Sequence, residues 1–180
     1  MKVTLPLSLI LLCLISFNST AQQECNTTDG FIQTAPDSRF TINGDGTVTD
    51  KQTGLMWARC REGFKGAGCT EQTYSLTTFE WSQAIGFESA TSDTVQRSDW
   101  RLPNVKELQS LVERSCSYPT INASVFPNTG NLSFWSASPD ANNTSSSLVW
   151  CVDFDDGIVT TYERFDIHAR RGVRLVRGGQ

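Results

Sequence analysis

Trp100-Arg-Leu-Pro-Asn-Val-Lys-Glu-Leu108 is the stretch that says most about the fold. Asn104 is a favourable helix N-cap, and Glu107 three positions later completes a capping box, in which each side chain accepts the other residue's backbone N–H. The apolar residues at its end and just beyond recur at helical spacing and form one buried face: Leu108, Leu111 and Val112. The stretch therefore predicts a helix that begins at Asn104 and ends near Arg114.

A second helix is expected upstream, near Phe79 to Phe87, capped by Thr77 or Thr78. Short strands separated by Gly- and Asp-rich turns surround both helices. In the segment 148–154, Leu148, Trp150, Val152 and Phe154 alternate and share one face. The strands are expected at 40–42, 47–49, 55–57, 134–138, 148–154, 158–162 and 172–177. This pattern predicts an α+β domain with short antiparallel strands, two mid-chain helices and long loops.

The N-terminus has the features of a cleavable secretory signal peptide. Lys2 precedes an apolar run, Leu5 to Ile15, which is shorter than the roughly 20 residues of a membrane span. Ser19-Thr-Ala21 then supplies the small residues that a signal peptidase reads. We expect a signal peptide at 1–21, an N-terminal arm at 22–38 and one domain at 39–180. The mature protein is expected to be secreted, periplasmic or at the cell surface, with no membrane span.

Charge is unevenly distributed along the chain. The formal net charge of −4 argues against a general nucleic-acid binder, which needs a basic face. The C-terminal segment 164–180 nevertheless contains only one acid, Asp166, and six basic residues: Arg164, His168, Arg170, Arg171, Arg174 and Arg177.

Five cysteines follow the signal peptide, and disulfides are their expected state in an exported protein. Cys60 and Cys69 flank a glycine-rich loop, so we expect them to pair. A bridge from Cys25 to Cys116 would pin the arm to the core, with Cys116 to Cys151 as the alternative. In the first arrangement Cys151 is a buried free thiol. The sequence has one histidine and no Cys-x-x-Cys pair, so no metal site is expected.

Several stretches together resemble one bacterial family, the Lcl C-terminal domain, named after the Legionella collagen-like adhesin: Asp45-Gly-Thr-Val-Thr-Asp50, Thr53-Gly-Leu-Met-Trp57, Trp100-Arg-Leu-Pro-Asn104, Glu107-Leu108, Phe134-Trp-Ser136 and Val173-Arg-Leu-Val-Arg177. The resemblance covers about residues 39–179. It implies a C-type-lectin-like fold and an adhesion role, since the namesake is associated with sulfated glycosaminoglycans. This chain lacks the collagen-like Gly-X-Y repeat of the namesake.

Catalysis and calcium binding are the alternatives that the residues raise. His168 is the only imidazole, and no Gly-x-Ser-x-Gly motif accompanies it, so an enzyme is not expected. Asp153, Asp155 and Asp156 suit either paired carboxylates or a hairpin turn. The Glu-Pro-Asn and Gln-Pro-Asp motifs of calcium-dependent lectins are absent. No cofactor is expected, and calcium held by these acids and Asn142-Asn143 stays an alternative.

The basic C-terminal cluster is the favoured site. Arg164, His168, Arg170 and Arg171 are candidates for binding sulfate or carboxylate groups, because guanidinium matches such anions in a bidentate manner. Arg174 and Arg177 are expected to be structural. The sequence thus predicts an exported, non-enzymatic binding or adhesion module, with an anionic polysaccharide, a glycosaminoglycan or a surface protein as partner. The alternative is a structural accessory domain of an envelope or surface complex with no small ligand.

Overall fold

A computed structural model describes residues 23–26, 28, 30–87, 99–142, 147–166, 168 and 170–178. The expected signal peptide at 1–21 lies outside these ranges. Within them, no helix is long and apolar enough to span a membrane.

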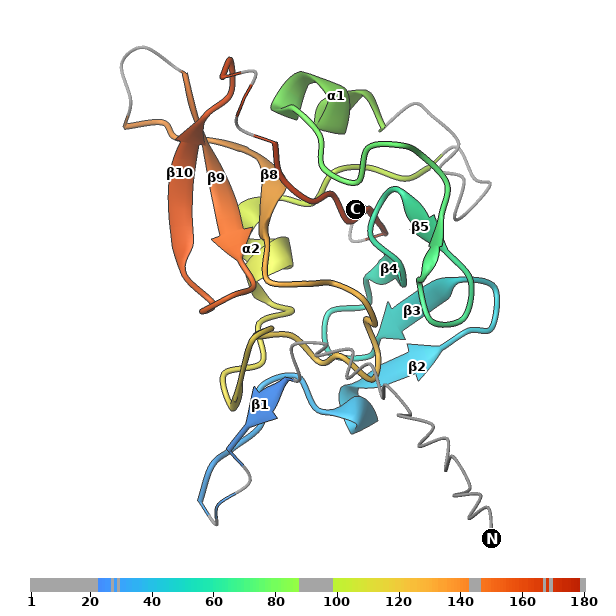
Figure 1. The fold of residues 1–180 in the computed structure, drawn as a ribbon. Coiled ribbons are helices and arrows are strands. Elements are labelled where there is room, and N and C mark those ends of the chain that lie inside the picture. Colours follow the sequence, from blue (N-terminus) through green and yellow to red (C-terminus); the bar gives the residue numbers. More distant parts are fainter. Residues whose placement is uncertain are drawn as a thin grey trace, which may run out of the picture.

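Two antiparallel sheets form the body of the molecule (Figure 1). The four-stranded sheet has the order β11-β4-β3-β2, from β2 (Phe40–Ile42), β3 (Thr47–Asp50), β4 (Met56–Ala58) and β11 (Val176–Arg177). The three-stranded sheet has the order β10-β9-β8, from β8 (Ser133–Pro139), β9 (Leu148–Asp153) and β10 (Val159–Glu163). In the first sheet the last strand of the chain pairs with β4, which joins the two ends of the domain.

Two small two-stranded sheets and a 3₁₀ turn complete the strand structure. β1 (Glu24–Cys25) pairs with β7 (Cys116–Ser117), and β5 (Phe64–Lys65) pairs with β6 (Glu71–Gln72). The 3₁₀ turn η1 (Asp37–Arg39) leads into β2. The mixed architecture with short antiparallel strands agrees with the predicted class.

Both predicted helices are present, and both are shorter than expected. α2 (Val105–Gln109) has the predicted capping box: the Glu107 backbone N–H donates to Asn104 Oδ1 at 2.9 Å, and the Asn104 N–H donates to Glu107 Oε2 at 2.8 Å. It stops at Ser110 instead of reaching Arg114. α2 packs on β8 and β9 (Figure 1).

The predicted cap of the first helix was wrong. α1 (Trp81–Gly86) begins after Glu80, not after Thr77 or Thr78, and Glu80 forms the capping box with Gln83. A carboxylate oxygen can accept a hydrogen bond from a backbone N–H, just as a hydroxyl oxygen can. The sequence offered two neighbouring hydroxyl residues, Thr77 and Thr78, as equally plausible N-caps, and neither caps the helix.

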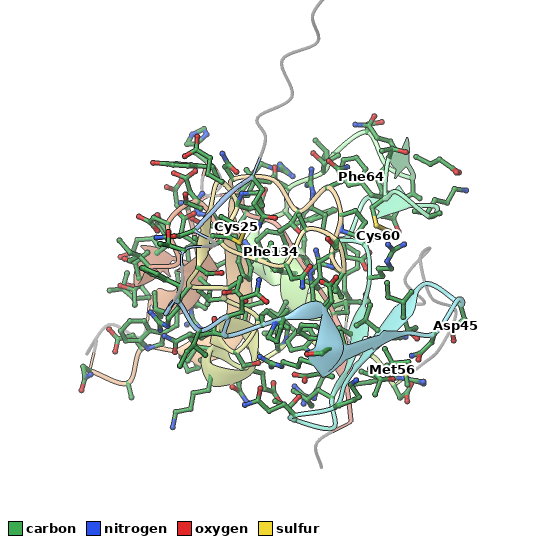
Figure 2. The ribbon with its side chains drawn as sticks, turned by 90° about the horizontal axis from the view of Figure 1, so that it is seen from below. Cys25, Asp45, Met56, Cys60, Phe64 and Phe134 are labelled. Atoms are coloured by element: carbon green, nitrogen blue, oxygen red, sulfur yellow. A yellow bond between two sulfur atoms is a disulfide. The ribbon has the colours of Figure 1, made fainter. Side chains whose placement is uncertain are left out.

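The core consists of two main apolar clusters. Three tryptophans are buried within it, Trp57, Trp100 and Trp135, whereas Trp81 and Trp150 are half-buried. Phe134 lies in the interior of the molecule (Figure 2). β9 is covered on both sides, since Val149 and Cys151 belong to one cluster and Val152 to the other. The simple alternation expected for this strand therefore described only one of its two buried faces.

The two disulfides link Cys25 to Cys116 and Cys60 to Cys69, as predicted, and Cys151 is a buried free thiol. Burial raises the pKa of the Cys151 thiol above its ordinary value. A protonated, buried thiol is a poor nucleophile. Disulfides form and persist in oxidising compartments, which is consistent with a location outside the cytoplasm.

The N-terminal arm is also held by Glu113, a residue that the sequence did not single out. Its buried carboxylate accepts backbone N–H groups from Thr34 at 3.1 Å and Ala35 at 2.6 Å. Ser115 donates its N–H at 2.9 Å and its hydroxyl at 2.7 Å to the same carboxylate. One side chain thus joins the arm to the segment after α2.

Candidate anion-binding surface

The C-terminal segment reaches its place by running between β8 and the start of α1. The Arg171 N–H donates to Phe79 O at 3.0 Å, and the Phe79 N–H donates to Arg171 O at 2.9 Å. On the other side the Trp135 N–H donates to Gly172 O at 3.1 Å. A Cβ on Gly172 would lie 2.8 Å from the Phe134 ring, so only glycine permits this approach.

Arg171 is held there by aromatic rings. Its guanidinium carbon lies 3.9 Å from the centre of the Tyr162 ring and 5.8 Å from that of Trp135. Nη1 donates to Arg170 O at 3.0 Å. Nε is buried and has no hydrogen-bond partner, and no carboxylate pairs with this side chain in the described part of the chain. The position of the cation is therefore fixed while its charge is not neutralised.

Arg164 follows β10 and is placed in a similar way. Its N–H donates to Ser147 O at 2.8 Å, which continues the β9–β10 pairing by one step. Its guanidinium carbon lies 4.5 Å from the Phe165 ring centre and 5.6 Å from that of Trp81. Within the described ranges it too has no carboxylate partner, and its Nε is buried without a hydrogen bond. Trp81 is itself oriented by donating from Nε1 to Ser136 O at 3.0 Å.

Arg170 differs from its two neighbours because its charge is already engaged. Its Nη1 lies 3.8 Å from Glu80 Oε1, Nη2 donates to Gln83 Oε1 at 3.2 Å, and Nε donates to Thr78 O at 3.4 Å. These contacts connect the basic segment to the first turn of α1. His168 is exposed in the preceding loop, where its backbone N–H donates to Asp166.

The structure thus separates the four sequence candidates by role. Arg164 and Arg171 carry unpaired charge on aromatic supports, and Arg170 is an anchor to α1. His168 is an exposed loop residue, for which the described part of the structure shows no side-chain contact with Arg164 or Arg171. Sequence reasoning missed the aromatic supports: Trp81 and Trp135 come from distant segments, and Tyr162 and Phe165 lie beside Arg164. We call Arg164, Arg171 and the rings of Trp81, Tyr162 and Phe165 the basic-aromatic surface. Trp135 supports Arg171 from the core, where it is fully buried.

Arg174 and Arg177 are structural, as expected. Arg174 is fully buried; it donates to Ala58 O at 2.8 Å and Thr129 Oγ1 at 2.9 Å and also to Arg59 O. Burial lowers the pKa of Arg174 to about 9, so it stays charged at neutral pH. Arg177 lies 3.3 Å from Asp99 and donates to Met56 Sδ from the edge of the four-stranded sheet.

The carboxylates of the acidic turns form hydrogen bonds and ion pairs within the protein. Asp153 Oδ2 accepts from the Ser133 hydroxyl at 2.6 Å and Oδ1 from the Asp155 N–H at 2.9 Å. Asp50 pairs with the buried Arg39, and Asp45 accepts from Thr47 at the tip of the β2–β3 hairpin (Figure 2). In the described residues, no group of three or more His, Cys, Asp or Glu is arranged to hold a metal ion.

These features define a small disulfide-bonded α+β domain with an exposed basic-aromatic surface. Residues 46–177 match the Lcl C-terminal domain family over more than half of the chain, and the chain belongs to this family. The matched range includes the three-stranded sheet, the four-stranded sheet except β2, both helices and all four basic candidates. No curated protein matches the chain.

Proposed function

We propose that this chain is an exported, non-enzymatic adhesion domain that binds anionic, in particular sulfated, glycans through its basic-aromatic surface. The observation that carries the proposal is the environment of the Arg164 and Arg171 guanidinium groups. Both guanidinium groups rest on aromatic rings, and neither is paired with a carboxylate of the described residues.

The two guanidinium groups favour an oxyanion as ligand, either a planar carboxylate or a tetrahedral sulfate. Guanidinium offers several N–H donors in a fixed fork, which sulfate and carboxylate groups accept in pairs. Because stacking on Tyr162 and Trp81 already restricts these side chains, less conformational entropy is lost when they bind. The repeating charges of a sulfated polysaccharide would meet two such groups.

The rings add a surface for the apolar faces of sugar units. Phe165 is 70% exposed and lies directly beside Arg164. A cation next to an exposed ring suits a ligand that alternates charged groups and C–H faces. Arg170 supports the site by tying the loop to α1 and is not proposed as a direct contact.

A glycan array, probed with and without calcium and at two salt concentrations, tests the function. The proposal expects binding to sulfated glycans that persists without calcium and weakens as salt screens the exposed charges. Calcium-dependent binding to neutral sugars would instead point to the acidic turns. If no glycan is bound, the domain serves as a structural accessory of a surface complex.

A further inference from the structure

A pocket lies at the opposite end of β10 from the basic-aromatic surface. It has a volume of about 240 Å³ and lies where the β9–β10 turn meets the segment after α2. The turn and the loop are joined by a hydrogen bond from the Tyr118 N–H to Asp155 O at 3.3 Å. The side chains that matter here are Arg114, Tyr118, Thr120, Asp155 and Asp156, with Gly157 at the turn.

The pocket presents charges of both signs. The Arg114 guanidinium and the Asp155 carboxylate have no hydrogen-bond or ion-pair partner within the described part of the chain. Asp156 accepts only the Ile158 N–H, through Oδ1 at 3.0 Å. The three groups line one pocket without neutralising each other, so the site has one positive and two negative charges to offer.

A buried hydroxyl on the pocket wall is also unsatisfied. Thr120 is 4% exposed, and its Oγ1 has no hydrogen-bond partner among the described residues. A Cβ on Gly157 would lie 3.5 Å from this oxygen, which places the hydroxyl beneath the turn glycine. Buried polar groups in native proteins are nearly always hydrogen-bonded, so this hydroxyl is available for a hydrogen bond to a group that enters the pocket.

Tyr118 supplies an apolar side to the pocket. Its side chain is 48% exposed, although tyrosine usually buries much of its ring. An aromatic ring beside two carboxylates attracts an ammonium group and covers an alkyl chain.

We infer that this pocket binds an ω-amino carboxylate: a carboxylate and a primary ammonium joined by a short alkyl chain. In this arrangement Arg114 takes the ligand carboxylate, Asp155 and Asp156 take the ammonium, and the chain lies along Tyr118. A neutral sugar fits less well, because it would cover three charges without providing any opposite charge. Free lysine and a lysine at the C-terminus of a protein share this chemistry.

Binding of 6-aminohexanoate to the full oxidised chain, followed by amide chemical shifts in NMR, is the direct test. We expect saturable shifts at the amides of Tyr118 and Gly157 with a Kd on the order of 1 mM or tighter. Hexanoate and hexylamine each lack one charge and should bind roughly tenfold more weakly or worse. Equal binding of all three compounds, or no saturable shift with 6-aminohexanoate, would overturn the inference.

Variants of the exposed charges assign the contacts without touching the core. Arg114→Gln and the double variant Asp155→Asn with Asp156→Asn should each weaken 6-aminohexanoate binding roughly tenfold. The matched control Asp140→Asn removes a charge from another loop and should leave the affinity unchanged. Unchanged affinity in the pocket variants, with the fold intact, would also overturn the assignment.

The source of the ligand is decided by three further probes: free L-lysine, a peptide with a C-terminal lysine, and the same peptide amidated. Binding of the free-ended but not the amidated peptide identifies a protein chain end, whereas binding of lysine alone identifies a metabolite. Arg164→Gln should not change any of these affinities. Failure of this inference is therefore distinguishable from failure of the glycan proposal.

Discussion

Single buried polar side chains hold segments of this domain that are far apart in sequence. Arg39 donates to Asp50 at 2.8 Å and, through Nη1, to Ser110 O at 2.8 Å, which connects η1 to β3 and to the end of α2. Glu113 and Arg174 act in the same way for the arm and for the C-terminal segment. Removing one member of such a set leaves the others buried and unpaired, which is why the cost is large.

Acid stability should depend measurably on Glu113. Burial alone would raise the pKa of this carboxyl, but hydrogen bonds from Ser115, Ala35 and Thr34 outweigh it and hold the folded-state pKa below the ordinary range. A depressed pKa contributes stability that is present above the unfolded value, about 4.3, and is lost as pH falls through the folded value.

The free energy of unfolding, measured by urea denaturation from pH 7 down to pH 3, is the readout for Glu113. The wild-type chain should lose stability over this range more steeply than Glu113→Gln, which is less stable at pH 7 and lacks the titrating group. Parallel pH profiles for the two proteins would contradict the assigned role.

The helix cap is a second residue-scale test. Asn104→Ala removes the acceptor for the Glu107 N–H and should lower the free energy of unfolding by about 1 kcal/mol. Asn104→Asp keeps an acceptor at the same place and serves as the control. A stability equal to wild type in Asn104→Ala would mean that this bond contributes nothing to α2.

Among the secondary-structure elements, the contact between β8 and the C-terminal segment sets the position of Arg171. Gly172→Ala would place a Cβ 2.8 Å from the Phe134 ring in the core and should cost about 1–3 kcal/mol through overpacking. Gly54→Ala is a useful comparison, because its added Cβ meets nothing within 4 Å, although its φ of +72° still disfavours alanine. Gly172→Ala should therefore lose more stability in thermal melts than Gly54→Ala.

The disulfides stabilise loops of very different length. Closing the Cys60–Cys69 loop, with a sequence separation of 9, is expected to contribute about 2.7 kcal/mol in the chain-entropy model, and closing Cys25–Cys116, with a separation of 91, about 4.6 kcal/mol. Replacing each pair by serines and comparing denaturation midpoints tests this order. A larger loss from the Cys60–Cys69 replacement would contradict it.

Local patterns predicted the elements well, and long-range contacts were harder. The capping box at Asn104 and the Cys60–Cys69 disulfide were predicted because each signal lies within one short motif. The Cys25–Cys116 disulfide was preferred over Cys116–Cys151 because the N-terminal arm needs an anchor, and the structure has this pairing. The Glu80 cap, the early end of α2 and the both-sided burial of β9 depend on tertiary neighbours that no local period reveals. The basic cluster was found by composition. Two of its aromatic supports, Trp81 and Trp135, come from segments far away in sequence, whereas Tyr162 and Phe165 lie beside Arg164 and were not recognised as supports.

For the whole molecule, the two proposed sites lie at opposite ends of β10. The turn at Asp155 and Asp156 precedes this strand and Arg164 follows it, so the five residues of β10 separate the sites by roughly 16 Å. This domain thus carries the proposed glycan-binding surface at one end of β10 and the proposed ω-amino carboxylate pocket at the other. The sites share a rigid sheet and no side chain, so each should respond only to its own variants.

Retention on a heparin column, measured as a function of sodium chloride, tests whether Arg164 and Arg171 bind sulfated glycans. The variant Arg164→Gln with Arg171→Gln should bind roughly a hundredfold more weakly than wild type, or worse, since two charge-assisted contacts are lost and each contributes about 1.5–3 kcal/mol. The control Lys51→Gln with Lys65→Gln removes the same charge elsewhere, and its retention should change little. Near-equal elution of the arginine variant, the lysine control and the wild-type chain would contradict the account.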